Sequence, residues 1–70
     1  MLNPKAPEGA KIFDYVELVG PKDQAVIDEA KIIAAECWRE TKATGKMYTR
    51  VLPEKDGYWG FAWSDKPFPA

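Results

Sequence analysis

One stretch of this chain, residues 21–44, has the length and the regular apolar spacing of a helix, and it limits the folds open to the rest. Its apolar side chains recur at steps of three and four residues, which places them on one face of a helix. They are Val26, Ala30, Ile33, Ala34, Cys37 and Trp38. Pro21 and Asp23 suit a helix start, and Gly45 suits the end. Every other segment is short and needs this helix as a cover.

Three segments are rich in β-branched and aromatic residues and are therefore predicted to be strands. They are residues 11–19, 46–52 and 58–64. We expect Pro53 to end the second strand, because proline cannot donate to a ladder. Asp56-Gly57 predicts a tight hairpin turn from the second strand into the third.

The predicted fold is a small α+β domain with the element order β-α-β-β. A helix of this length reverses the chain, so the first two strands run parallel to each other and the third runs against both. Placing the third strand between them gives a three-stranded antiparallel sheet in the order 1-3-2. The alternative order, 1-2-3, needs one parallel pair. We favour 1-3-2, because it puts the most aromatic strand in the centre.

The long helix is predicted to pack on one face of this sheet. In the third strand Trp59, Phe61 and Trp63 alternate onto a single face, and we expect that face to form the core under the helix. The other sheet face is expected to be open to solvent or to a partner. Ile32 lies among the polar positions of the helix, where we expect an exposed side chain or a second contact surface.

The length of 70 residues predicts a single small domain spanning 1–70. Within it we expect an extended N-terminal segment at 1–10, a folded core at 11–64 and a C-terminal tail at 65–70. The tail contains Phe68 between two prolines. This ring either anchors on a partner or folds back onto the core.

The composition argues against catalysis. The chain has no histidine, which removes the commonest general base and zinc ligand at neutral pH. Cys37 is the only cysteine, so no internal disulfide and no thiolate cluster can form. Glu36 and Glu40 are interpreted as a solvated acidic edge of the helix. We therefore expect no catalytic residues, no metal and no cofactor.

The formal net charge is −1 and the sequence pI is about 5.3, so no overall positive field draws the chain to nucleic acid or to anionic lipid. The chain contains no apolar run long enough to span a membrane, and its start turns polar at once, unlike a signal peptide. These features predict a cytoplasmic protein without a membrane partner.

In size, acidity and predicted element order, the chain resembles several small phage-encoded inhibitors of host or defence complexes, anti-CRISPR proteins among them. The resemblance implies a rigid small domain that acts sterically, by occupying a surface that another macromolecule needs. It lies at the level of fold and size, and therefore assigns no role to any residue.

A protein partner is the first expectation, bound at a sheet edge or on the open sheet face. The predicted partner-binding residues lie on that face and in the hairpin: Tyr15, Tyr48, Arg50, Lys55 and Tyr58. A nucleic-acid-binding domain that uses the same face is an alternative, since exposed aromatics beside basic residues can stack on bases. A structural subunit of a larger assembly is another alternative, and a homodimer is a further option.

Overall fold

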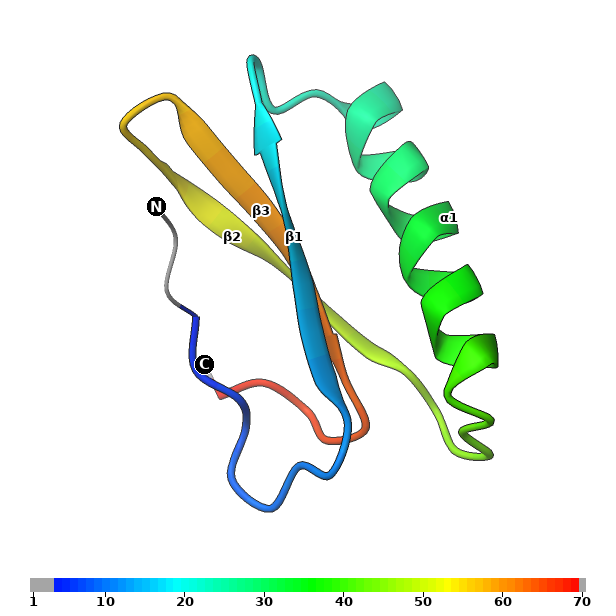
Figure 1. Cartoon of the computed structure of the whole chain (residues 1–70). Coiled ribbons are helices and arrows are strands. Elements are labelled where there is room, and N and C mark those ends of the chain that lie inside the picture. The colour runs from blue at the N-terminus through cyan, green and yellow to red at the C-terminus, as the bar shows by residue number, and fades with distance from the viewer. Residues whose placement is uncertain (1–3, 70) are drawn as a thin grey trace.

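The computed structural model describes residues 4–69. It contains four elements in chain order: β1 (Phe13–Val19), α1 (Gln24–Glu40), β2 (Tyr48–Lys55) and β3 (Tyr58–Ser64). The strands form one sheet in the order β1-β3-β2, and β3 is antiparallel to both neighbours (Figure 1). The predicted α+β class, element order and strand order 1-3-2 are confirmed.

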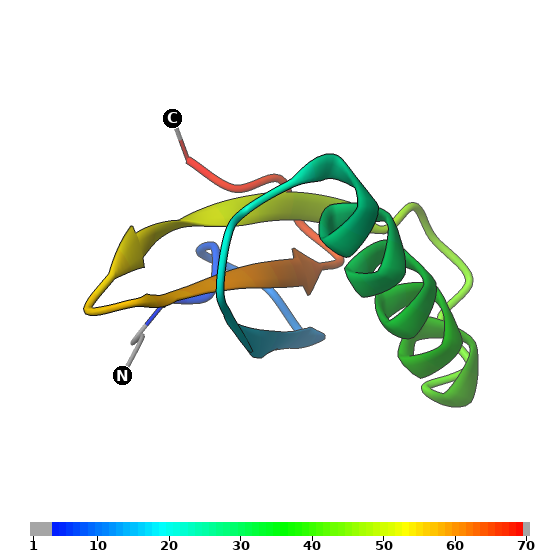
Figure 2. The ribbon, with the colours of Figure 1, turned by 90° about the horizontal axis from the view of Figure 1, so that it is seen from above.

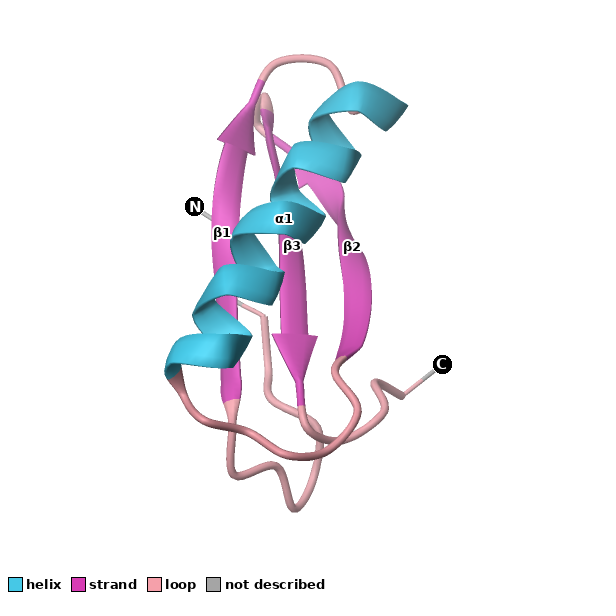
Figure 3. Cartoon of the chain, turned by 90° about the vertical axis from the view of Figure 1, so that its right-hand side faces the viewer, coloured by secondary structure: helices cyan, strands magenta, loops and turns pink. Residues whose placement is uncertain are grey.

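α1 crosses one face of the sheet diagonally, and the connection from β1 through α1 to β2 is right-handed. Figure 3 views the molecule from the helix side, with β1 on the left, β3 behind α1 and β2 on the right. Right-handed crossovers follow from the twist of the strands and are nearly universal. This arrangement places the central strand directly beneath the helix.

The core lies between α1 and β3. Ala30 and Ala34 are fully buried against Phe61 and Trp63, so small helical side chains face large rings. Residues of β1, α1 and β2, together with Met47, surround this centre: Val16, Leu18, Ile27, Cys37, Trp38, Met47 and Val51. The predicted packing of the aromatic strand under the helix is confirmed.

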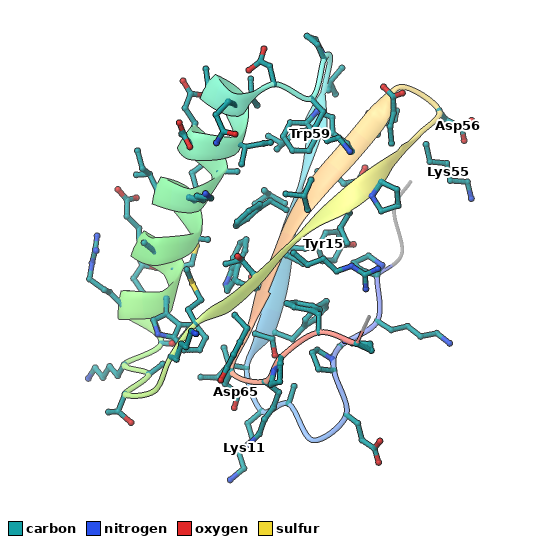
Figure 4. The ribbon with its side chains drawn as sticks, turned by 180° about the vertical axis from the view of Figure 1, so that it is seen from behind. Lys11, Tyr15, Lys55, Asp56, Trp59 and Asp65 are labelled. Carbon is teal, nitrogen blue, oxygen red and sulfur yellow. The ribbon has the colours of Figure 1, made fainter. Side chains whose placement is uncertain are left out.

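Trp59 is also fully buried on the helix side, and Figure 4 shows it between α1 and the sheet. Its indole N–H has no hydrogen-bond acceptor. A buried donor without a partner costs about 1–3 kcal/mol, which the surrounding apolar burial has to offset.

α1 is shorter than the predicted range of 21–44. The predicted capping role of Asp23 is confirmed, because Asp23 is the N-cap and its side chain accepts from the backbone N–H of Val26 at 3.0 Å. The helix itself begins at Gln24, and Pro21 precedes it. The end of the helix also differs from the prediction. The hydroxyl of Thr41 donates to the carbonyl of Trp38 at 2.6 Å, and Lys42 adopts the left-handed conformation with φ of 60°. These residues end the helix before Gly45, so the predicted end at Gly45 is wrong.

Three strand boundaries differ from the predicted ones, and the first is the start of β2, which lies at Tyr48 rather than at residue 46. β1 begins at Phe13 rather than at residue 11, and β3 has its predicted bounds. β2 continues past Pro53 to Lys55, so the prediction that Pro53 ends the strand is wrong. The register of β2 against β3 shifts between Leu52 and Lys55. Proline is tolerated at such a bulge on an edge strand, where its missing N–H breaks no ladder bond.

The predicted hairpin is confirmed. Lys55 and Tyr58 are partners across the ladder, which leaves Asp56 and Gly57 as a two-residue loop. Their φ angles are 56° and 80°. Two positive φ angles in succession are typical of a type I′ turn, whose twist matches that of the flanking strands.

The sheet face away from α1, called here the second face, is largely covered rather than open. Its side chains follow from the register: Phe13, Tyr15, Glu17, Val19, Tyr48, Arg50, Leu52, Lys55, Tyr58, Gly60, Ala62 and Ser64. Gly60, Ala62 and Ser64 are buried, and so is Pro7. The expectation of an open second face is therefore wrong for most of its length.

The two terminal segments provide this cover. Figures 1 and 2 show that both lie on the side of the sheet away from α1. The ring of Phe68 is half-buried and meets the ring of Phe13 edge-on, with centroids 6.2 Å apart. Of the two alternatives for Phe68, the structure has the one in which it folds back.

Asp65 holds the terminal segments together at the start of β1. Its Oδ1 accepts from the backbone N–H of Lys11 at 3.0 Å and from that of Ile12 at 3.3 Å, and its own N–H donates to the carbonyl of Ile12 at 3.2 Å. Desolvation raises the pKa of Asp65, but the backbone hydrogen bonds from Ile12, Lys11 and Asp65 itself, together with the charge of Lys66, outweigh it, and the net pKa lies below the ordinary 3.8.

Candidate functional site

The antiparallel register arranges the second face in rows of three side chains, one from each strand. The rows are Val19–Tyr58–Lys55, Glu17–Gly60–Leu52, Tyr15–Ala62–Arg50 and Phe13–Ser64–Tyr48. Partners directly across a ladder have Cβ atoms about 4.5–5.5 Å apart. Each row is therefore a local group of side chains, and successive rows lie about 7 Å apart along the strands.

The first of these rows, called here the end row, is the part of the second face where large apolar and aromatic side chains remain exposed. Val19 has 75% and Tyr58 has 40% of its surface exposed, and Lys55 is also exposed. Figure 4 shows Lys55 and Asp56 at the tip of the hairpin, at the opposite end of the sheet from Lys11 and Asp65. The terminal segments therefore cover the other end of this face.

Local sequence explains why the end row projects. The tight turn at Asp56-Gly57 holds Lys55 and Tyr58 at the end of the β2–β3 hairpin. Val19 is the last residue of β1. Gly20 follows with φ of 102° and turns the chain toward α1. The result is an aliphatic side chain, a phenol and an ammonium group side by side in solvent.

The predicted site residues do not form one cluster. Tyr58 and Lys55 lie together in the end row, and Tyr15 and Arg50 flank Ala62 two rows away. Tyr15 is half-buried and Arg50 is exposed. The structure thus divides the predicted set into separate places.

Tyr48 is the outlier of the predicted set. It pairs with Ser64 at the far end of the face, about 20 Å along the strands from Tyr58. The Nζ of Lys46 lies 5.1 Å from the centre of its ring, a cation–π arrangement. Tyr48 therefore already has a partner within the chain and stands apart from the end row.

Val19 is the residue that sequence reasoning left out of the site. The alternation of β1 puts it on the same face as Tyr15. The order 1-3-2 then brings the last residue of β1 beside the first residue of β3, which is Tyr58. The predicted topology contained this signal, since the predicted strands 11–19 and 58–64 already placed Val19 and Tyr58 at neighbouring strand ends.

The remaining chemistry of the described chain is sparse. Within residues 4–69 no group of three or more histidine, cysteine, aspartate or glutamate side chains is placed to hold a metal ion. Cys37 is half-buried beside the core. Across the same range, α1 is neither long enough nor apolar enough to cross a membrane.

Comparison of the chain with protein-family models, with curated proteins and with solved structures finds no match. The function is therefore argued from the geometry of the site.

Proposed function

We propose that this protein is a small non-catalytic module that binds another protein through its end row. The observation that carries the proposal is the exposure of Val19 and Tyr58 side by side on a face that the chain otherwise covers. A phenol beside an aliphatic side chain is a favourable centre for an interface, because tyrosine contributes large area at low entropic cost. Lys55 supplies a charged rim next to it.

The mode of action that fits is steric. We expect the domain to be rigid, because α1 and the terminal segments cover its sheet on opposite sides. A rigid domain loses little entropy when it docks, and it can occupy a surface that another macromolecule needs. An inhibitor of a larger complex, of the kind that phages encode, is the form of this function that we propose.

Nucleic-acid binding is less well supported by the geometry. The three large rings of β3, Trp59, Phe61 and Trp63, are buried. They are therefore not available as the stacking platform that such binding uses. Arg50 and Lys55 remain as cations on the second face, but Tyr48 is paired with Lys46.

The test is affinity capture from a lysate of the cells that make the protein, with and without nuclease, read by quantitative mass spectrometry. We compare the tagged chain with Val19→Glu and Tyr58→Ser. Ile32→Glu is the matched control, because Ile32 is 60% exposed but lies on α1. A protein that survives nuclease, is lost with the end-row variants and is retained by the control supports the proposal.

Two results would overturn it. One is a partner retained equally by the Val19 and Tyr58 variants, which would place the interface elsewhere. The other is capture that disappears with nuclease and falls steeply with salt, because released counterions drive nucleic-acid binding.

A further inference from the structure

β1 has an unpaired edge. Within residues 4–69 it pairs only with β3. The N–H of Asp65 donates to the carbonyl of Ile12, so these two residues occupy a hydrogen-bonded position of the ladder. Bonded and non-bonded pairs alternate in an antiparallel ladder. The residues that turn their backbone groups away from β3 are therefore Phe13, Tyr15, Glu17 and Val19.

The other edge of the sheet is a poorer template. By the same alternation β2 turns Thr49, Val51 and Pro53 outward. Proline has no N–H to offer, and the irregular register follows it directly. Among the bonds between described residues, one outward donor of β1 is occupied, because the N–H of Tyr15 donates to the carboxylate of its neighbour Asp14 at 2.8 Å.

α1 extends over the free edge of β1. Figure 3 shows the C-terminal end of the helix projecting past β1, where no strand of the described chain lies beneath it. A strand added beside the start of β1 would therefore lie under the C-terminal end of α1. The existing core already reaches this border, because Val16 and Leu18 pack against it from β1 and are only half-buried.

The flank of α1 above this border carries a stripe of acidic and apolar residues. Each residue turns about 100° around the axis. Those that directly precede the buried Ala30 and Ala34 therefore face one flank, and those that follow them face the other. The helix is right-handed and runs downward in Figure 3, so the preceding residues face the β1 side. These preceding residues are Glu29 and Ile33. Glu36 and Glu40 follow at helical steps of three and four residues and continue the same flank. Together the four residues form what is called here the acidic stripe, and all are exposed.

The acidic side chains around the free edge of β1 determine which kind of strand can bind there. β1 adds Asp14 and Glu17 to the same side of the molecule, whereas Lys31 lies on the opposite flank of α1. A second copy that paired edge to edge would bring its own carboxylates against these. Like charges in such proximity disfavour the complex. The complementary occupant is a basic segment.

We propose that the free edge of β1 accepts a fourth strand from a partner, and that this strand is an extended segment with basic and apolar side chains. Its backbone pairs with the outward groups of Phe13 and Glu17, and its basic side chains meet Glu36 and Glu40 beside the C-terminal end of α1. An apolar side chain beside Ile33, which is 43% exposed, completes the core border. This site does not depend on the end-row side chains, so either proposal can fail alone.

The probe is a short synthetic peptide of alternating lysine and valine, titrated into the isotope-labelled full chain and followed by NMR. We expect the amide signals of Phe13, Glu17 and Val19 to shift and their hydrogen exchange to slow. The same peptide N-methylated at every residue keeps its charge but has no backbone N–H to donate to a strand. We expect it to bind at least about tenfold more weakly, the equivalent of roughly 1.4 kcal/mol. Equal binding by both peptides would overturn the proposal.

A matched pair of variants separates local contact from general attraction. Glu36→Lys and Asp28→Lys make the same charge change on α1, but only Glu36 belongs to the acidic stripe. We expect Glu36→Lys to weaken binding of the lysine–valine peptide about tenfold and Asp28→Lys to weaken it about twofold at most. Equal losses would mean that the peptide is held by long-range attraction alone, against the proposal. A chain that sediments as a dimer through this edge would also contradict it.

Discussion

At the scale of single residues, Asp65 is the carboxylate whose environment departs most clearly from solution. It accepts two backbone hydrogen bonds from the segment that precedes β1, and it does so only in the folded chain. These bonds lower its native pKa below the ordinary 3.8. A carboxylate with a depressed native pKa stabilises the fold above its unfolded pKa, and that contribution is lost as the pH falls through the native value.

This linkage predicts the behaviour of Asp65→Asn. At neutral pH we expect a lower free energy of unfolding than in the parent chain, because a neutral amide oxygen accepts more weakly than a carboxylate. As the pH falls below 3.8, the two should converge, since the parent then loses the same charge. Urea denaturation as a function of pH measures both. Glu54→Gln, at an exposed carboxylate of β2, is the control. A gap that persists at acid pH would refute the charge explanation.

At the scale of elements, two glycines differ in whether the backbone conformation requires glycine. Gly57 occupies the hairpin turn with φ of 80°, whereas Gly45 lies outside the left-handed region after α1. A Cβ at either position meets nothing within 4 Å. The two sites therefore differ in backbone conformation and not in crowding.

We predict opposite effects for the two alanine variants. Gly57→Ala should destabilise the chain by about 1–2 kcal/mol, because a Cβ is disfavoured in the left-handed region. Gly45→Ala should be neutral or should stabilise by about 0.4–1 kcal/mol, because it restricts the unfolded chain. Chemical denaturation of both variants against the parent chain is the measurement. A loss at Gly45 equal to that at Gly57 would contradict this assignment.

The sequence predicted the elements of the fold but not all of their ends. Period and alternation are local, so they predicted α1, the three strands and the packing of Phe61 and Trp63 beneath the helix. The helix end was missed because it depends on a specific bond from Thr41 and on a left-handed lysine, which propensities do not contain. β2 was ended too early because Pro53 is tolerated only through its place at a bulge.

The candidate site was predicted in part, for a related reason. Tyr58 and Lys55 were identified because the hairpin turn is a local signal. The cover over Ala62 was not predicted, because it comes from terminal segments far away in sequence. Contacts such as that between Phe13 and Phe68 join positions whose pairing has no local pattern. Val19 was missed because its exposure depends on where that cover stops.

At the scale of the whole molecule, the chain has three layers: α1, the sheet, and the terminal segments on the second face (Figure 2). β3 is buried on both sides, with large rings toward α1 and small residues toward the terminal segments. A domain of this size has little core to spare. The terminal segments therefore contribute to the stability of the fold. The end row and the β1 edge are surfaces that they leave free.

This view predicts a measurable contribution from the tail. Phe68→Ala removes a half-buried ring that contacts Phe13. We expect it to lower the free energy of unfolding by roughly 1 kcal/mol, about half of the value for a fully buried phenylalanine. Pro69→Ala, at the exposed neighbour, is the matched control. Hydroxyl-radical labelling should also rise at Phe13 in the Phe68 variant alone. If both variants unfold alike and label alike, the tail is a passive extension, and the second face owes its burial to the N-terminal segment around Pro7.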